Sequence, residues 1–269
     1  MPAGTERQRR AAAGPGLGLI AAKALVHALA AAPLALLGWR AWQVGSGADL
    51  DALGADPVAA IEHTLGLWAL RLLLLTLAVT PLRQLLGQPL LVRFRRMLGL
   101  WAFAYACLHF SAWLVLDLRG WWALVPKEIA ERPYITVGFA AWLLLLPLAL
   151  TSTRGWMRRL GRNWGRLHRL VYPVAALAVL HFWWVVKADV REPLLYAAIL
   201  AVLLGWRLAW RWRAPTQPRG RASAGAEQQQ QGQQPGQQPR RDQQPGQSHG
   251  AAAAARSDGA SLGDGGLHG

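Results

Sequence analysis

The sequence predicts an all-α, multi-pass membrane protein with six transmembrane helices. Three observations support this fold class. Of the 269 residues, 53% are hydrophobic, the apolar residues gather in long runs, and short Arg-rich loops separate these runs. Each run is close to the ~20 residues that a helix needs to cross a bilayer. The runs lie roughly at 18–40, 63–82, 98–117, 135–151, 169–187 and 193–212.

The first of these segments needs separate justification, because it also resembles a secretory signal peptide. It follows a basic stretch and contains the small-residue run Ala30–Ala32. It is long for the apolar part of a signal peptide, and Lys23 and His27 interrupt it. We therefore expect it to stay in the protein as the first helix. The second, third and sixth segments have full length, whereas the fourth and fifth are the shortest.

The distribution of charge predicts the orientation of the helices. Arginine residues gather before the first helix, after the second, after the fourth and after the sixth, whereas the remaining loops are acidic or balanced. The acidic residues of those loops include Asp49, Asp51, Asp56, Glu62, Asp189 and Glu192. Because cytoplasmic loops carry the excess of Lys and Arg, we expect both chain termini to lie in the cytoplasm.

The composition also divides the chain and excludes some classes of protein. We expect a cytoplasmic segment at 1–16, a six-helix domain at 17–213, and a disordered cytoplasmic tail at 214–269 that is rich in Gln, Gly, Pro and Ala. The net charge of +15 does not indicate a nucleic-acid-binding protein, since the arginines occupy alternate loops instead of one face. The single cysteine, Cys107, excludes an intrachain disulfide and a cysteine-based iron–sulfur or zinc site.

Two histidines lie in the middle of apolar segments, where an ionisable side chain indicates function. His109 lies 13 residues after Arg96, and His181 lies 12 residues after Arg169. At 1.5 Å per residue, both lie roughly 18–20 Å from the cytoplasmic surface on helices of the same direction. Two imidazoles at one depth can hold a b-type haem between them as axial ligands. The alternative is that each imidazole makes a hydrogen bond across the bundle.

His168 lies 13 residues before His181, which corresponds to about 220° around an ideal helix and places the two on different faces. His168 is therefore either a histidine of the membrane interface or a ligand at a second, inner cofactor site. The third helix has no histidine at the same depth, so the spacing alone does not support a second haem with two histidine ligands.

Three further polar residues are candidates for the chemistry around a haem. Glu62 and His63 lie together at the outer start of the second helix. They are either interfacial residues or a quinone site at which protons are exchanged. Arg71 lies about nine residues from the outer end of the same helix, deeper than a topology signal requires. We expect it to face the bundle interior or a haem propionate.

Several long motifs in order resemble the MsrQ family, formerly called YedZ. The matching stretches are GADPVAAIEHTLG at 54–66, TPLRQLLGQPLLVRFRRMLGLWAFAYACLHF at 80–110, ERPYITVGFAAW at 131–142, LALTSTRGWMRRLGRNWGRLHRLVYPVA at 148–175 and VLHFWWVVK at 179–187. The resemblance covers roughly residues 15–213 and extends more widely to ferric-reductase-like transmembrane domains, which carry haem between helices. The Gln-rich tail departs from the family pattern.

The resemblance implies a cytochrome b-like bundle in the bacterial inner membrane. Members of the family pass electrons from the respiratory quinone pool through haem b to MsrP, a periplasmic molybdopterin enzyme that reduces methionine sulfoxide in oxidised proteins. They are also described as binding FMN. Their haem-associated histidines fall on His109, His168 and His181 here. The resemblance thus implies an electron-transfer subunit that does not itself carry the catalytic site.

Two other functions remain open at this stage. A ferric-reductase-like electron carrier fed by a cytosolic flavoprotein would need an attached or separate flavin and nucleotide domain, and this chain has no room for one. A haem-free transporter would use the histidines to move metal ions or protons. A colourless purified protein would favour the transporter.

Overall fold

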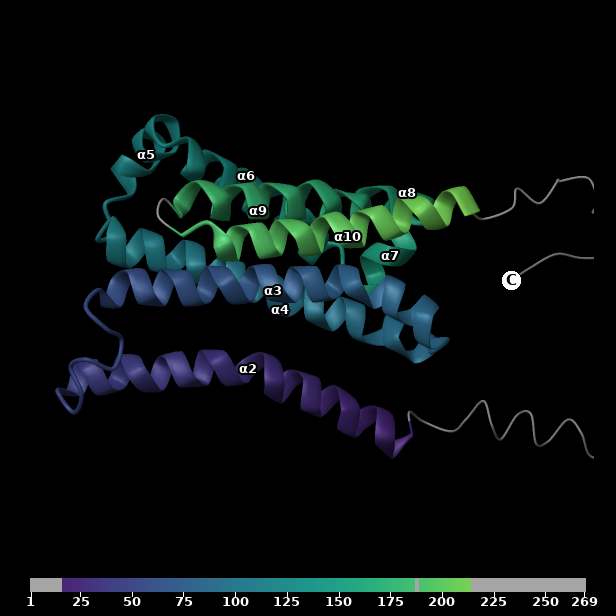
Figure 1. The fold of residues 1–269 in the computed structure, drawn as a ribbon, viewed down its shortest axis with the longest axis horizontal. Coiled ribbons are helices and arrows are strands. Elements are labelled where there is room, and N and C mark those ends of the chain that lie inside the picture. The colour runs from purple at the N-terminus through teal and green to yellow at the C-terminus, as the bar shows by residue number, and fades with distance from the viewer. Residues whose placement is uncertain (1–15, 187–188, 214–269) are drawn as a thin grey trace, which may run out of the picture. The chain divides into compact units, whose positions relative to one another are not determined.

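Long apolar helices run alternately up and down through the part of the chain that the structure, a computed structural model, describes (Figure 1). This part comprises residues 16–186 and 189–213, and no strand occurs in it. The long helices are α2 (Leu17–Ser46), α3 (Pro57–Leu86), α4 (Val92–Ala112), α6 (Pro133–Leu150), α9 (Val171–Val185) and α10 (Arg191–Arg213). The tail predicted at 214–269 lies outside the described residues.

Short elements connect the long helices at both ends of the bundle. Three are 3₁₀ turns: η1 (Pro89–Leu91), η3 (Trp122–Leu124) and η4 (His168–Leu170). A π-helical segment, η2 (Trp113–Asp117), continues α4. The remaining connectors are the short helices α5 (Val125–Glu131), α7 (Arg154–Leu160) and α8 (Arg162–Leu167).

The predicted fold class, an all-α multi-pass membrane protein, is confirmed. Five helical stretches of the described residues are long and apolar enough to cross a membrane: α2, α3, α4 with its flanking turns, α6 and α10. The remaining predicted span, the fifth at 169–187, corresponds to α9, which has only 15 residues. At 1.5 Å per residue this helix is shorter than the ~30 Å hydrocarbon layer. The count of six transmembrane helices is therefore not confirmed.

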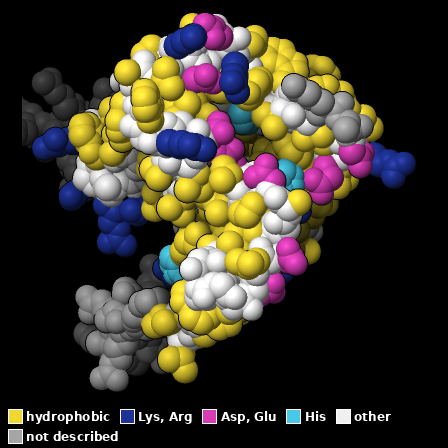
Figure 2. Space-filling model, turned by 90° about the vertical axis from the view of Figure 1, so that its left-hand side faces the viewer, with side chains coloured by type: hydrophobic (Ala, Val, Ile, Leu, Met, Phe, Trp, Pro, Cys, Tyr) yellow, Lys and Arg dark blue, Asp and Glu magenta, His cyan; other side chains and the backbone are white. Residues whose placement is uncertain are grey.

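The two ends of the bundle carry opposite charge, and we name them accordingly. The acidic end comprises residues 47–56, 117–132 and 189–192, and it contains most acidic side chains of the described chain. The basic end comprises residues 87–96 and 151–170, which include ten arginines or histidines and no acid. Figure 2 views the acidic end, where acidic side chains lie among hydrophobic ones and a histidine is visible between them. α4 and α9 both run from the basic end to the acidic end, as predicted.

α3 forms the centre of the bundle. Its side chains Leu72, Leu73, Leu74 and Leu77 are all buried, so this helix is apolar on every face instead of along one stripe. α4 packs against α3 along most of its length, and α6 packs in the same way against α9. The molecule therefore contains two antiparallel helix pairs, α3–α4 and α6–α9, with α10 against both α3 and α9.

An arginine of α10 supplies a hydrogen bond that the backbone of α3 lacks. Pro81 lies inside α3 and has no N–H group, so the carbonyl of Leu77, four residues earlier, loses its helical partner. Arg207 extends from α10 and donates to that carbonyl at 2.7 Å, and also to Thr80 Oγ1 at 3.1 Å and to the Tyr172 hydroxyl. A membrane-embedded carbonyl without a partner is costly, so Arg207 stabilises α3 where Pro81 interrupts its hydrogen bonds.

α2 is peripheral by comparison. Only Ala30 and Leu37 of its residues are buried. It is held by hydrogen bonds from α4: the Tyr105 hydroxyl donates to the Ala30 carbonyl at 2.7 Å, and Trp101 Nε1 donates to His27 Nδ1 at 2.9 Å.

Candidate haem site

The structure brings the rings of His109 and His181 together in the half of the bundle nearer the acidic end. Their ring centres are 6.2 Å apart, and the ring planes cross at 71°. His109 comes from α4 and His181 from α9, and both side chains are partly buried. The two arginine spacings predicted that both histidines lie at the same depth, and the structure places their rings next to each other.

Hydrogen bonds to the main chain orient both imidazoles. His109 Nδ1 lies 3.0 Å from the carbonyl oxygen of Glu62, and His181 Nδ1 lies 2.7 Å from that of Tyr134. A carbonyl oxygen only accepts, so Nδ1 carries the proton in each ring and Nε2 keeps its lone pair. This is the arrangement of a histidine that is ready to bind a metal through Nε2.

The two histidine environments repeat along the chain. In both, 47 residues separate the histidine from the residue whose carbonyl accepts its proton. The pairs Glu62 and Tyr134, Gly66 and Gly138, and His109 and His181 are each 72 positions apart. Both copies contain Thr-x-Gly at the first helix and His-Phe at the second.

The two glycines of this repeat were not among the residues predicted from the sequence. A Cβ atom on Gly138 would lie 2.7 Å from His181 Nδ1, and one on Gly66 would lie 3.2 Å from His109 Nδ1. Each histidine ring therefore rests on helix backbone where a side chain is missing. The repeated Thr-x-Gly at a separation of 72 was the signal in the sequence that could have identified both positions.

Glu62 and His63 do not pair with each other. His63 Nε2 lies 3.8 Å from Glu192 Oε2 on α10, with about half of each side chain exposed. The main chain of Glu62 binds His109, and its carboxyl atom Oε1 is buried without a hydrogen-bond partner among the described residues. The two residues thus flank the histidine pair in different ways, and their role as a quinone site stays a prediction.

Arg71 is tied to α10 as well. Its Nε atom donates to the Tyr196 hydroxyl at 2.8 Å, and its guanidinium lies over the Trp68 ring at 5.1 Å from the ring centre. The residue faces the bundle interior as expected. Contact with a haem propionate stays a prediction, since these interactions already account for the position of the side chain.

His168 lies apart from the pair, at the basic end on η4. Its ring stacks on Trp164 at 4.0 Å between ring centres, and its Nδ1 donates to the Trp164 carbonyl at 3.2 Å. Burial lowers the pKa of His168 below its ordinary value. The Trp164 and Leu148 carbonyls oppose this effect, and the charge of Arg95 adds to it. A lowered pKa keeps the imidazole neutral at physiological pH, which is the form that binds metals.

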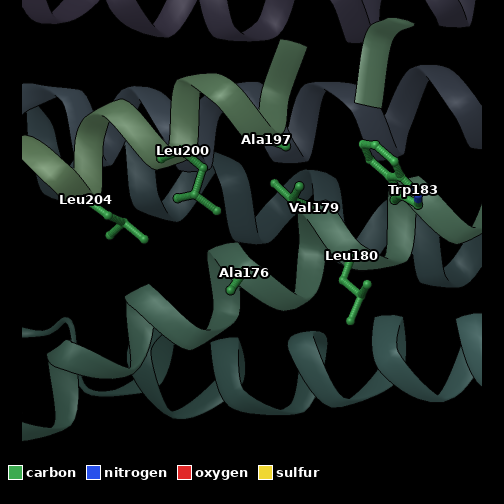
Figure 3. A pocket seen from close by; sticks show the side chains of 8 residues that line it. Ala176, Val179, Leu180, Trp183, Ala197, Leu200 and Leu204 are labelled. Atoms are coloured by element: carbon green, nitrogen blue, oxygen red, sulfur yellow. The ribbon is translucent and has the colours of Figure 1, made fainter. Parts of the chain in front are cut away.

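Two hollows lie on the surface of the bundle. A groove of about 340 Å³ runs between α9 and α10, and its lining is apolar except for the Trp183 indole (Figure 3). A second hollow of about 520 Å³ lies between α2 and α3 near the acidic end, and Arg40 and Thr64 are among its lining residues. The second hollow combines apolar walls with polar groups, as small-molecule sites do.

The geometry of the histidine pair fits a haem. A metal–imidazole bond is about 2.0–2.1 Å long, so two imidazoles that share one metal have ring centres roughly 6 Å apart. The observed separation of 6.2 Å agrees with this spacing. The pair supplies two ligands, which is the number that porphyrin-bound iron leaves open. No group of three or more His, Cys, Asp or Glu side chains able to hold a bare metal ion occurs among residues 16–186 and 189–213.

Comparisons with known proteins place the chain in a family. Residues 65–179, which include His109 and end two residues before His181, match the family described as ferric reductase like transmembrane component. A protein of Xanthomonas axonopodis pv. citri is 68% identical over 205 residues, covering 76% of this chain and 93% of the relative. It is named as the haem-binding subunit MsrQ of a protein-methionine-sulfoxide reductase. The chain belongs to the MsrQ family.

Other members of the MsrQ family support the same assignment. The protein from Xanthomonas euvesicatoria pv. vesicatoria is 72% identical over 190 residues, covering 71% of this chain and 87% of the relative. The protein from Bordetella pertussis is 53% identical over 171 residues, covering 61% and 80%. Both carry the same name. No solved structure matches the chain. The predicted resemblance is thus confirmed.

Proposed function

We propose that this protein is the haem-binding membrane subunit of a methionine sulfoxide reductase system, with His109 and His181 as the axial ligands of one b-type haem. The observation that carries this proposal is the facing pair of imidazoles, each with Nδ1–H bound to a main-chain carbonyl. A haem held by these two residues would supply one-electron transfer. The chain's own contribution is to bring the two rings together and to leave both Nε2 atoms free to bind iron.

The surroundings of the pair suit electron transfer without acid–base chemistry. The carbonyls of Glu62 and Tyr134 fix the tautomer of each imidazole and raise its basicity as a ligand. Aromatic side chains cover the space between α4 and α6, where Phe110 stacks on Trp142 with 4.7 Å between ring centres. Such packing excludes water and lowers the local dielectric, which is one way in which a protein sets a haem potential.

We further propose a second cofactor, FMN, at the basic end near His168. Two cationic side chains, Arg95 on α4 and Arg207 on α10, lie within electrostatic range of each other. Neither makes an ion pair in the described part of the chain, where both ion pairs lie nearer the acidic end. An anionic group such as a phosphate would offset this unbalanced charge. The neutral imidazole of His168 and the Trp164 indole would form the adjacent wall.

The proposed donor and acceptor come from the resemblance to the MsrQ family, and the charge asymmetry supports the proposed orientation. We propose the bacterial inner membrane as the location, with the basic end and both termini in the cytoplasm and the acidic end in the periplasm. A quinol supplies the electrons, with Glu62 and His63 as its proton acceptors. A periplasmic MsrP-like reductase receives the electrons near the acidic end, toward which His109 and His181 lie. Arg71 is our candidate for a propionate contact.

Two alternatives make different predictions. A cytosolic flavoprotein could supply the electrons instead of quinol, in which case reduction of the haem would depend on a nicotinamide nucleotide. A haem-free transporter would yield a colourless protein. The MsrQ relatives, named as haem-binding subunits, favour the haem protein over the transporter.

The test is the absorption spectrum of the purified full-length protein, oxidised and dithionite-reduced, for wild type and for His109→Ala, His181→Ala and His168→Ala. We expect a sharp reduced α-band of b-type haem that both ligand variants lose and His168→Ala keeps. Flavin fluorescence after denaturation reports FMN, which we expect only His168→Ala to lose. A colourless wild type from haem-replete cells would contradict the proposal, and a band that survives in His109→Ala or His181→Ala would refute the ligand assignment.

A further inference from the structure

We propose that Gly66 and Gly138 are positioning residues of the haem site, which orient the ligand imidazoles by leaving the helix backbone bare beneath each ring. The proposal rests on the proposed function in so far as the rings bind haem. Its geometric part, the contact of each glycine with one histidine, stands on the structure alone.

The contact at Gly138 is the closer of the two. The three heavy atoms nearest to a Cβ built on Gly138 all belong to His181, at 2.7 Å for Nδ1, 2.8 Å for Cε1 and 3.1 Å for Cγ. No real Cβ approaches a heavy atom so closely, and the neighbour is a ring held in place by its own bond to Tyr134. Any side chain at this position would therefore displace the ring.

Gly66 makes the same kind of contact with His109, but at a longer distance. Here too the three nearest heavy atoms belong to one imidazole, at 3.2 Å for Cε1, 3.2 Å for Nδ1 and 3.6 Å for Nε2. Small residues in membrane helices commonly serve to bring two backbones together. At these two positions the group that approaches the backbone is the histidine ring, which points to ligand placement instead of general helix packing.

The remaining helical glycines do not share this environment. A Cβ on Gly99 of α4 would meet only the Thr76 side chain at 3.7 Å, an ordinary contact, and one on Gly38 or Gly205 would meet nothing within 4 Å. Among the described glycines, only Gly66 and Gly138 face an imidazole. They are also the two glycines related by the 72-residue repeat.

Each glycine lies four residues after the carbonyl that its histidine uses. Glu62 precedes Gly66 and Tyr134 precedes Gly138 by one helical turn, so carbonyl and bare backbone lie on the same helix face. The bond from Nδ1–H to this carbonyl makes Nε2 a stronger electron donor, which favours ferric over ferrous haem. Moving the ring away from the carbonyl would weaken that preference.

The test compares Gly138→Ala, Gly66→Ala and the control Gly99→Ala in the full-length, haem-loaded protein by redox titration of the α-band. We expect Gly138→Ala to lose haem or to raise the midpoint potential. A tenfold weaker preference for ferric haem corresponds to a rise of about 59 mV. Gly66→Ala raises the potential less, and Gly99→Ala leaves it at the wild-type value.

A second measurement separates positioning from general damage to the fold. Thermal unfolding is measured for Gly138→Ala in the wild-type and the His181→Ala backgrounds. We expect the alanine to lower Tm only where His181 is present, since the clash is with its ring. An equal loss in both backgrounds, or unchanged potential and haem content in both glycine variants, would overturn the proposal. If His181→Ala retains the haem band, the ligand assignment fails, while this coupling still tests the contact.

Discussion

The α3–α4 and α6–α9 pairs present a histidine in the same way, but their surroundings differ. In both, the imidazole donates to the carbonyl four residues before a glycine. α3 and α4 are long helices in the centre of the bundle, and they form hydrogen bonds with α10 and α2. α6 and α9 have 18 and 15 residues, and their ring–backbone contact is the tighter one.

This comparison indicates that few features of the surrounding helices are required to position an imidazole. A main-chain carbonyl that accepts from Nδ1 and a glycine beneath the ring are common to both sites, whereas helix length and the hydrogen bonds with α2 are not. Substitutions at the shared elements should therefore act on the haem, and substitutions at the elements found only around α3 should act on stability or on proton transfer.

The largest expected effect separates the main chain of Glu62 from its side chain. We expect Glu62→Gln and Tyr134→Phe to keep full haem content, because in both positions the main-chain carbonyl binds the histidine. Glu62→Gln should also slow haem reduction by quinol about a hundredfold, as loss of a general base does, whereas Tyr134→Phe should not. Stopped-flow absorbance with a soluble quinol gives both rates. Equal rates for the two variants would remove Glu62 from the proton path.

The next prediction tests the hydrogen bond from Arg207 of α10 to the Leu77 carbonyl of α3. Arg207→Leu leaves the Leu77 carbonyl without a donor and should lower the stability by about 1–3 kcal/mol, the cost of an unsatisfied buried group. In a Pro81→Ala background the new N–H can bond to Leu77 instead, so the same substitution should cost less. Thermal unfolding followed by circular dichroism measures both. A loss of equal size in the two backgrounds would mean that Arg207 acts through Tyr172 or Thr80.

The helices, their directions and the depth of the two histidines could be predicted from the sequence, each for a different physical reason. Apolar run length and Arg-rich loops predicted the helices and their directions, because bilayer thickness and charge act on local sequence. The depth of His109 and His181 could be counted from Arg96 and Arg169, since a helix converts residue number into height. These local rules explain why the meeting of the two rings was predictable.

Contacts between distant segments were beyond such rules. The partner of His63 is Glu192 and not its neighbour Glu62, because adjacent residues on a helix point to different faces. Likewise, the bond from Arg71 to Tyr196 joins positions 125 residues apart. The fifth segment was expected to be among the shortest, but the start of α9 was not predicted, since the apolar run begins in η4 and the helix itself starts only at Val171.

A smaller effect tests how α2 is attached to the α3–α4 side of the bundle. Tyr105 is only 1% exposed, and its hydroxyl donates to the Ala30 carbonyl. We expect Tyr105→Phe to cost about 0.6 kcal/mol, the typical value for a hydrogen bond between membrane helices. Haem content should stay at the wild-type value, because α2 contributes no ligand. Chemical-denaturant unfolding of both proteins measures the difference, and a loss of haem would show that α2 supports the site.

The smallest effect concerns the ion pair between His63 and Glu192. The separation is 3.8 Å and both side chains are about half exposed, so screening by solvent leaves an interaction of at most ~0.5 kcal/mol. We therefore expect His63→Gln and Glu192→Gln to unfold within a degree or two of wild type, in high and in low salt. If His63 accepts a proton from quinol, His63→Gln alone should slow haem reduction while Glu192→Gln does not. Equal slowing in both variants would instead indicate that the pair orients a shared surface, and unchanged rates in both would remove His63 from the quinone site.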